Sequence, residues 1–176
     1  MKSLGTFVLL LALLTDPTKI GKINALKSDA KKAYLAGDYK TAIKKYRYLV
    51  DSLNVQEDEV LLNLANAYYQ LNDTTNASSQ YQSLTQSPKS QLRSKAQQQL
   101  GVVTNKQGKF EEALEHFKQA IKSDPTNNDA RYNYELLKKK LEEQKKQEEK
   151  KNQEQNKDQE KHFDIRDKKG HYTKIE

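Results

Sequence analysis

The stretch "GKFEEALEHFKQAIKSDP", residues 108–125, decides the fold of this chain. Its apolar residues recur mostly three and four positions apart, which is the spacing of one face of an α-helix. Gly108 stands before this helix and suits a turn with positive φ, whereas Pro125 follows the helix and cannot extend it. Small and bulky residues alternate on the apolar face: Phe110, Ala113, Phe117 and Ala120. The stretch therefore predicts one half of a helical hairpin, in which another helix comes close at the alanines.

The same pattern occurs three times along the chain. The turn residue recurs in steps of 35 and 36 residues, at Gly37, Asn72 and Gly108. A small residue follows five positions later, at Ala42, Ala77 and Ala113, and a bulky one four positions beyond that, at Tyr46, Tyr81 and Phe117. The matching places on the first helices are Ala30, Leu64-Ala65 and Leu100-Gly101. This pattern, with a period near 34, resembles the tetratricopeptide repeat (TPR), a helix-turn-helix unit. The resemblance covers about residues 22–126.

The resemblance implies an all-α solenoid in which three repeats stack to form a continuous core. We expect the repeats within residues 16–126, at about 17–54, 57–88 and 90–125, with Asp16 and Pro17 starting the first helix. Residues 127–143 resume the first-helix pattern but no second helix follows, which predicts a capping helix. The residues expected to cover the third repeat are Tyr132, Tyr134 and Leu137.

Residues 144–176 form a charged, low-complexity tail. Past Leu141 no aliphatic or aromatic residue appears until Phe163, and Glu-to-Lys pairs such as Glu142 with Lys146 recur four apart. Such pairs support an exposed helix, whereas the lack of apolar residues is typical of disorder. An extended helix and a disordered tail both remain open.

The N-terminus reads as a targeting segment. Lys2 precedes an uncharged apolar run of eleven residues, Leu4 to Leu14. This length suits the core of a signal peptide and is short for a bilayer span, which takes about 20 residues. A small-x-small cleavage site is missing near Thr15. We expect residues 1–15 to be a signal peptide or a membrane tether, and the protein to be exported, either periplasmic or tethered to the inner membrane.

Composition argues against catalysis. The chain has no cysteine, which excludes disulfides, thiolate metal sites and a cysteine nucleophile. Its three histidines are scattered, at 116, 162 and 171, and neither a phosphate-binding glycine loop nor Gly-x-Ser-x-Gly is present. We expect no enzymatic activity, no cofactor and no metal.

The net charge of +7 is concentrated in residues 22–53, where eight basic residues accompany three acidic ones. We interpret this segment as a solvated helix face. The alternative is an electrostatic contact with nucleic acid or an anionic membrane, drawing on Lys31-Lys32 and Lys44-Lys45.

Binding is the remaining function. In this family the stacked first helices line a concave groove, and the resemblance implies that eleven residues face a partner there. They are Lys27, Lys31, Tyr34, Leu62, Asn63, Asn66, Tyr69, Lys95, Gln98, Val102 and Asn105. We expect Tyr34, Asn66 and Tyr69 to dominate, because aromatic residues give large contact area at little entropic cost. The alternative is that the tyrosines only pack between neighbouring helices.

Some family members hold a peptide's C-terminal carboxylate in a lysine–asparagine clamp. Lys27, Asn63 and Lys95 match three of its places, whereas Lys31 and Gln99 depart from it. The match is therefore partial.

Further segments resemble the tetratricopeptide protein of the bacterial aerotolerance (Bat) operons: "DPTKIGKIN", "GDYKTAIKKYRYLVDSL", "EDEVLLNLANAYYQL" and "ARYNYELLKKKLEEQ". This resemblance implies an envelope scaffold that works beside von Willebrand A-domain membrane proteins and a MoxR-type ATPase. The rival interpretation is a cytosolic, co-chaperone-like adaptor that binds C-terminal peptides.

Overall fold

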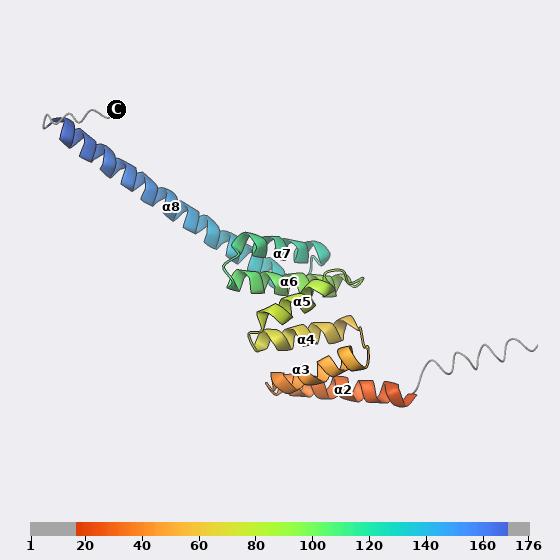
Figure 1. Cartoon of the computed structure of the whole chain (residues 1–176). Coiled ribbons are helices and arrows are strands. Elements are labelled where there is room, and N and C mark those ends of the chain that lie inside the picture. The colour runs from red at the N-terminus through yellow and green to blue at the C-terminus, as the bar shows by residue number, and fades with distance from the viewer. Residues whose placement is uncertain (1–16, 169–176) are drawn as a thin grey trace, which may run out of the picture. The chain divides into compact units, whose positions relative to one another are not determined.

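The computed structural model describes residues 17–168, and the side chains of residues 18–159. Three helical hairpins follow one another: α2 (Pro17–Leu35) with α3 (Tyr39–Arg47), α4 (Asp58–Gln70) with α5 (Thr74–Leu84), and α6 (Ser90–Lys106) with α7 (Phe110–Ser123). The seventh helix is α8 (Asn128–Lys168), and the described residues contain no strand. Figure 1 shows α2 to α7 stacked in chain order. The predicted all-α arrangement is confirmed, whereas the targeting segment and Asp16 lie outside the described residues.

The three predicted turns are present. Gly37 and Gly108 have φ of 78°, and Asn72 has φ of 58°, which is the left-handed region that asparagine tolerates among residues with a side chain. The next residue caps the second helix in two of the hairpins. Asp38 accepts a hydrogen bond from the Thr41 amide, and Asp73 accepts one from the Asn76 amide, each at 3.1 Å. These bonds fix the start of α3 and α5.

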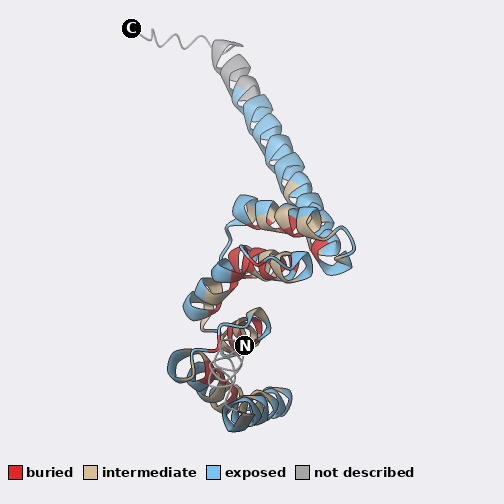
Figure 2. Cartoon of the chain, turned by 90° about the vertical axis from the view of Figure 1, so that its right-hand side faces the viewer, coloured by how far each residue is buried: buried red, intermediate tan, exposed pale blue. Residues whose placement is uncertain are grey.

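Each hairpin buries small residues, and in the third hairpin one of them faces an aromatic ring. Ala42, Ala77 and Ala113 are fully buried, as are Ala30 and Ala65. Gly101 on α6 shows how close the approach is, because a Cβ added there would lie 2.5 Å from Cε1 of Phe117 on α7. Tyr46 and Tyr81 are buried in the equivalent places of the first two hairpins. Figure 2 shows the buried residues along the faces that the helices turn toward one another.

The end of α3 departs from the regular helix that the sequence predicts. Residues Tyr48–Ser52 form a π-helical turn, η1, in which the Leu53 amide donates to the Tyr48 carbonyl at 3.1 Å. Asn54 then takes a φ of 54°. The wider turn leaves both Leu49 and Val55 buried in the first core cluster. The three-and-four periodicity continues through this turn, so the apolar pattern does not reveal it.

The chain divides into two compact units, residues 1–133 and 134–176. In the first unit, the Asn127 side chain accepts a hydrogen bond from the Ala130 amide at 3.0 Å and so caps α8, and Ala130 is fully buried. Tyr132, expected to cover the third repeat, is 67% exposed, so that expectation is wrong. Two residues along a helix turn through about 200°, which places Tyr132 nearly opposite Ala130.

The second unit continues α8 as one helix to Lys168. Tyr134 is half-buried and Leu137 is buried. Every described side chain from Glu142 to Gln159 is exposed, as the pale length of α8 in Figure 2 shows. Of the two alternatives for the tail, the structure has helix over residues 144–168. None of the helices between residues 17 and 168 is long and apolar enough to cross a membrane.

The Gly101 contact gives a test of the packing. We expect Gly101→Ala to lower the free energy of unfolding by about 1–3 kcal/mol, because its methyl group overlaps the buried Phe117 ring. Gly21→Ala on α2 is the matched control, since nothing lies within 4 Å of its Cβ position, and we expect it to raise stability by about 0.5–1 kcal/mol. Urea denaturation followed by circular dichroism measures both.

A second background separates the steric overlap with Phe117 from the change in helix propensity that Gly101→Ala also causes. In a Phe117→Leu background the ring is gone, so Gly101→Ala should cost less than it does beside Phe117. Equal costs in the two backgrounds would contradict the proposed close contact.

Candidate functional site

The eleven residues predicted to face a partner all lie on the first helices of the hairpins, α2, α4 and α6. Helix α4 contacts both α2 and α6, so these helices form one surface, here called the first-helix face. Nine of the eleven residues fall into three rows whose members are 35 and 36 positions apart. The rows are Lys27, Leu62 and Gln98; Lys31, Asn66 and Val102; and Tyr34, Tyr69 and Asn105. Asn63 and Lys95 complete the set.

The first row joins one repeat to the next, and two of its members offer no surface to a partner. Leu62 is 8% exposed and packs in the second core cluster. Gln98 is 7% exposed, and its Oε1 accepts a hydrogen bond from Asn127 Nδ2 at 3.2 Å. The prediction that Leu62 and Gln98 line an open groove is therefore wrong. The repeat register alone does not show that this row is covered by the next repeat or the next helix, whereas the rows beside it are less covered.

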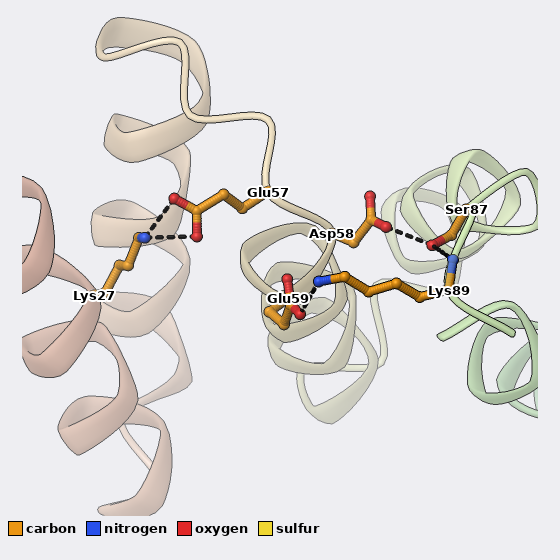
Figure 3. Close-up of polar contacts among 6 residues, drawn as sticks. All are labelled: Lys27, Glu57, Asp58, Glu59, Ser87 and Lys89. Atoms are coloured by element: carbon orange, nitrogen blue, oxygen red, sulfur yellow. Dashed lines mark hydrogen bonds and ion pairs between the residues drawn. The ribbon is translucent and has the colours of Figure 1, made fainter. Parts of the chain in front are cut away.

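Lys27, the third member of that row, is held in an ion pair. Its Nζ lies 2.5 and 2.6 Å from the two carboxylate oxygens of Glu57, the residue immediately before α4 (Figure 3). A peptide carboxylate at Lys27 would have to displace Glu57. This arrangement weakens the match to a carboxylate clamp.

Three consecutive acidic residues join the second repeat to both of its neighbours. Glu57 reaches back to α2, whereas Asp58 and Glu59 reach forward to the connection between α5 and α6 (Figure 3). Asp58 accepts a hydrogen bond from the Ser87 hydroxyl, and Glu59 accepts one from Lys89 Nζ at 2.5 Å. The hydrogen bond to Lys89 lowers the pKa of Glu59 and raises that of Lys89. All three carboxylates are thus engaged within the protein.

The third repeat meets α8 through amides and a hydroxyl instead of charges. Asn127 Nδ2 donates to Ser94 Oγ at 2.9 Å, in addition to Gln98. Ser94 is fully buried and donates in turn to the Ala120 carbonyl at 2.8 Å. This network satisfies polar groups that burial would otherwise leave without partners.

The second row mixes surface and structural residues. Lys31 is exposed and forms no ion pair with any described residue. Val102 is half-buried. Asn66 Oδ1 accepts a hydrogen bond of 2.7 Å from the hydroxyl of Tyr81, which is fully buried on α5. Burial also raises the pKa of Tyr81, so this hydroxyl stays protonated and needs an acceptor.

The third row contains the two tyrosines expected to dominate binding, and both take part in packing. Tyr34 is half-buried against the first core cluster, with its ring edge-on to Tyr39 at a centroid distance of 5.4 Å. Tyr69 is half-buried against the second cluster and lies 5.8 Å from Lys106 Nζ, which sits over its ring. Asn105, in contrast, is exposed. The tyrosines therefore serve the fold at least in part.

An open pocket of about 340 Å³ lies between α2 and α4 on this surface. It contains three of the predicted residues, Lys27, Lys31 and Asn63, together with Ser28, Tyr46, Glu57, Glu59 and Val60. Both signs of charge line it, but Lys27 and Glu57 neutralise each other and Glu59 is bound by Lys89. Of the two lysines in this pocket, Lys31 is the one that forms no ion pair with a described residue.

The described residues contain no group of three or more His, Asp or Glu side chains that could hold a metal ion. His116 lies on α7, where its Nδ1 is 2.8 Å from Gln97 Oε1 and burial lowers its pKa.

Two stretches of the chain match models of one repeat family. The family model described as "Tetratricopeptide repeat" matches residues 59–90, and the one described as "TPR repeat" matches residues 101–134. A curated relative, "Inactive peptidyl-prolyl cis-trans isomerase shutdown" of Bombyx mori, is 30% identical over 121 residues, which are 61% of this chain. The match spans only 28% of that relative's length.

Solved structures share the fold. The Sgt2 TPR domain of Aspergillus fumigatus has a TM-score of 0.62 at 23% identity, over 71% of this chain and 82% of that one. The C-terminal TPR-containing domain of a putative FK506-binding protein of Plasmodium falciparum scores 0.59 at 27% identity, over 75% and 96%. The first TPR of Spaghetti (RPAP3), bound to the HSP90 peptide SRMEEVD, scores 0.60 at 24% identity, over 69% and 94%. The chain therefore carries tetratricopeptide repeats and folds as a TPR solenoid.

The hydrogen bond between Asn66 and Tyr81 changes what the sequence led us to expect of Asn66. The structure shows that Asn66→Ala leaves a buried hydroxyl without an acceptor, which should lower the free energy of unfolding by about 1–3 kcal/mol. Chemical denaturation measures the loss.

A double-mutant cycle isolates the bond. Adding Tyr81→Phe removes the orphaned hydroxyl, so the double variant should be less destabilised than the sum of the two single variants. If the losses of stability of the two single variants simply add, the hydrogen bond contributes nothing and Asn66 is free to contact a partner.

Proposed function

We propose that this chain is a non-catalytic scaffold that binds a segment of a partner protein on its first-helix face. The proposal rests on those residues, among the ones predicted to face a partner, that are exposed and take no part in the packing of the fold. Lys31, Lys95 and Asn105 are exposed, and neither lysine forms an ion pair with a described residue. Residues that served only the fold would be buried or paired, as Leu62 and Gln98 are.

The positive charge of Lys31 and Lys95 indicates the charge of the partner segment. Lys31 on α2 and Lys95 on α6 form no ion pair with a described residue, and the acidic residues that share a pocket with Lys31 are bound by Lys27 and Lys89. An acidic segment that crosses the face would meet unpaired positive charge, with Asn63 and Asn105 as hydrogen-bonding groups. We therefore propose an acidic partner segment.

Site-specific photo-crosslinking tests the proposal. A photoreactive amino acid placed at Lys31 or Lys95 should crosslink to a partner, whereas the same residue at Lys118, exposed on α7, should not. Mass spectrometry of the adduct identifies the partner segment and its charge. Removing residues 144–176 should leave both crosslinks in place. Equal crosslinking from Lys118, or loss of the adducts on removal of the tail, would place the function elsewhere.

A C-terminal-peptide adaptor is the second candidate function. The structure of Spaghetti with the HSP90 peptide SRMEEVD shares this fold, and Lys27, Lys31 and Asn63 line one pocket here. If this function holds, peptide SRMEEVD should bind at least about tenfold more tightly with a free C-terminus than with an amidated one, because amidation removes the carboxylate. Glu57→Gln should then strengthen binding, since it releases Lys27. Equal binding of the free and amidated peptides would reject the adaptor but not the scaffold.

We further propose that the scaffold acts in the bacterial envelope, in an aerotolerance-type complex with von Willebrand A-domain membrane proteins and a MoxR-type ATPase. Support comes from the sequence resemblance to the Bat-operon proteins and from the apolar run Leu4 to Leu14. Purification from membranes under native conditions should recover these partners. Intact mass of the purified protein should distinguish removal of residues 1–15 from their retention, and recovery of the full-length protein from the cytosol alone would reject export.

A further inference from the structure

A second charged surface lies on the first hairpin, outside the first-helix face. An open pocket of about 400 Å³ is lined by residues of α3 and η1, among them Lys40, Lys44, Arg47 and Tyr48. Lys22 of α2 reaches the same place, with its Nζ 6.0 Å from the centroid of the Tyr48 ring. We call this cluster of four cations and one tyrosine the basic pocket. It shares no residue with the predicted groove.

The charge of the basic pocket is not neutralised within the protein. Its single carboxylate, Asp51, is paired with Arg47 at 3.0 Å. Lys40 and Lys44 form no ion pair with any described residue, and they lie four positions apart, on one side of α3. Asp29 binds Lys45 at 3.3 Å, and Asp38 caps α3 while its charge also acts on Lys40. Lys22, Lys40 and Lys44 therefore form no ion pair among the described residues.

An exposed aromatic ring accompanies these charges. Tyr48, which lines the basic pocket, is 41% exposed. A tyrosine with an apolar ring and a polar tip, next to long lysine side chains, is the combination that suits the boundary between lipid headgroups and acyl chains. A duplex of nucleic acid offers phosphate but no apolar layer, so it accounts for the lysines and leaves the exposed Tyr48 ring unexplained.

The position of the hairpin in the chain supplies the second observation. The apolar run ends at Leu14, and α2 begins at Pro17. Three Cα–Cα steps span at most about 11 Å, which is close to the Debye length of about 8–10 Å at physiological salt. If the apolar run enters a bilayer, the start of α2 therefore stays within the range of the surface charge.

We propose that the first hairpin binds the headgroups of anionic phospholipids through the basic pocket, as the second of two membrane contacts. An apolar segment of eleven residues is a weak anchor by itself, and stable attachment usually takes two signals, such as one apolar group and a basic patch. The basic pocket provides the second signal. Membrane attachment leaves the first-helix face to the partner protein.

Vesicle co-sedimentation of the full-length protein tests this proposal. Vesicles of phosphatidylcholine alone measure the apolar contribution, and vesicles that also contain phosphatidylglycerol add the electrostatic one. We expect the partition coefficient to rise with phosphatidylglycerol and to fall with added salt. Each lysine near an anionic surface contributes about fivefold, so Lys40→Gln with Lys44→Gln should reduce the partition coefficient on anionic vesicles about 25-fold and leave that on neutral vesicles unchanged.

The matched control is Lys118→Gln with Lys122→Gln, two exposed lysines with the same spacing on α7. It removes the same charge and should reduce anionic partitioning by less than about twofold, because α7 lies in another repeat. Circular dichroism melts should show that both double variants remain folded.

Three results would overturn the proposal. Equal loss for the two double variants would show that only net charge matters. Tighter binding to a short DNA duplex than to anionic vesicles, lost in Lys40→Gln with Lys44→Gln, would assign the basic pocket to nucleic acid. Saturable calorimetric binding of glycerol phosphate at the same pocket, with no preference for anionic vesicles, would assign it to a soluble anion.

Discussion

The rest of this structure depends on one steric constraint, the contact between a very small residue on the first helix of a hairpin and an aromatic ring on the second. Gly101 and Phe117 show it most directly, because no room remains for even a methyl group. Ala30 and Ala65 are fully buried at the equivalent places of the other hairpins, in the same clusters as Tyr46 and Tyr81. The small residue lets the helices approach, and the ring fills the space between them and the next hairpin. Both the pairing of helices and the stacking of repeats follow from this alternation.

Polar contacts between the first helices then fix how each hairpin is aligned on the one before it. The residue immediately before α4 is Glu57 and the residue before α6 is Lys89, and neither side chain caps its own helix. Each reaches back to the preceding first helix, where Glu57 meets Lys27 and Lys89 meets Glu59. Exposed ion pairs of this kind contribute only about 0.2–1 kcal/mol each, so the buried apolar clusters supply most of the stability. The ion pairs decide which surfaces remain for a partner, because they occupy the acidic residues and Lys27.

Much of this arrangement was predictable from the sequence, for identifiable reasons. Spacing of three and four fixes which side of a helix is apolar, and Gly37, Asn72 and Gly108 mark turns because few residues tolerate positive φ. The repeat period then predicted the position of each helical hairpin along the chain. What remained hidden depends on neighbours that spacing does not reveal. The burial of Leu62 and Gln98 arises from the neighbouring repeat or the following helix, the role of Asn66 arises from the hydroxyl of Tyr81, and the π-helical turn at Tyr48 leaves the apolar pattern unchanged.

The alternating polarity of the ion pairs also restricts how such an array can evolve. The first hairpin presents Lys27 to whatever follows it, the second begins with Glu57, and the third begins with Lys89. If the second hairpin were deleted, Lys27 would face Lys89, and two like charges would meet where an attractive pair now stands. A duplicated second hairpin would instead set the carboxylate of Glu59 against a second Glu57. The hairpins share one shape but are not interchangeable, because either of these two rearrangements would replace an attractive pair of charges by a repulsive one.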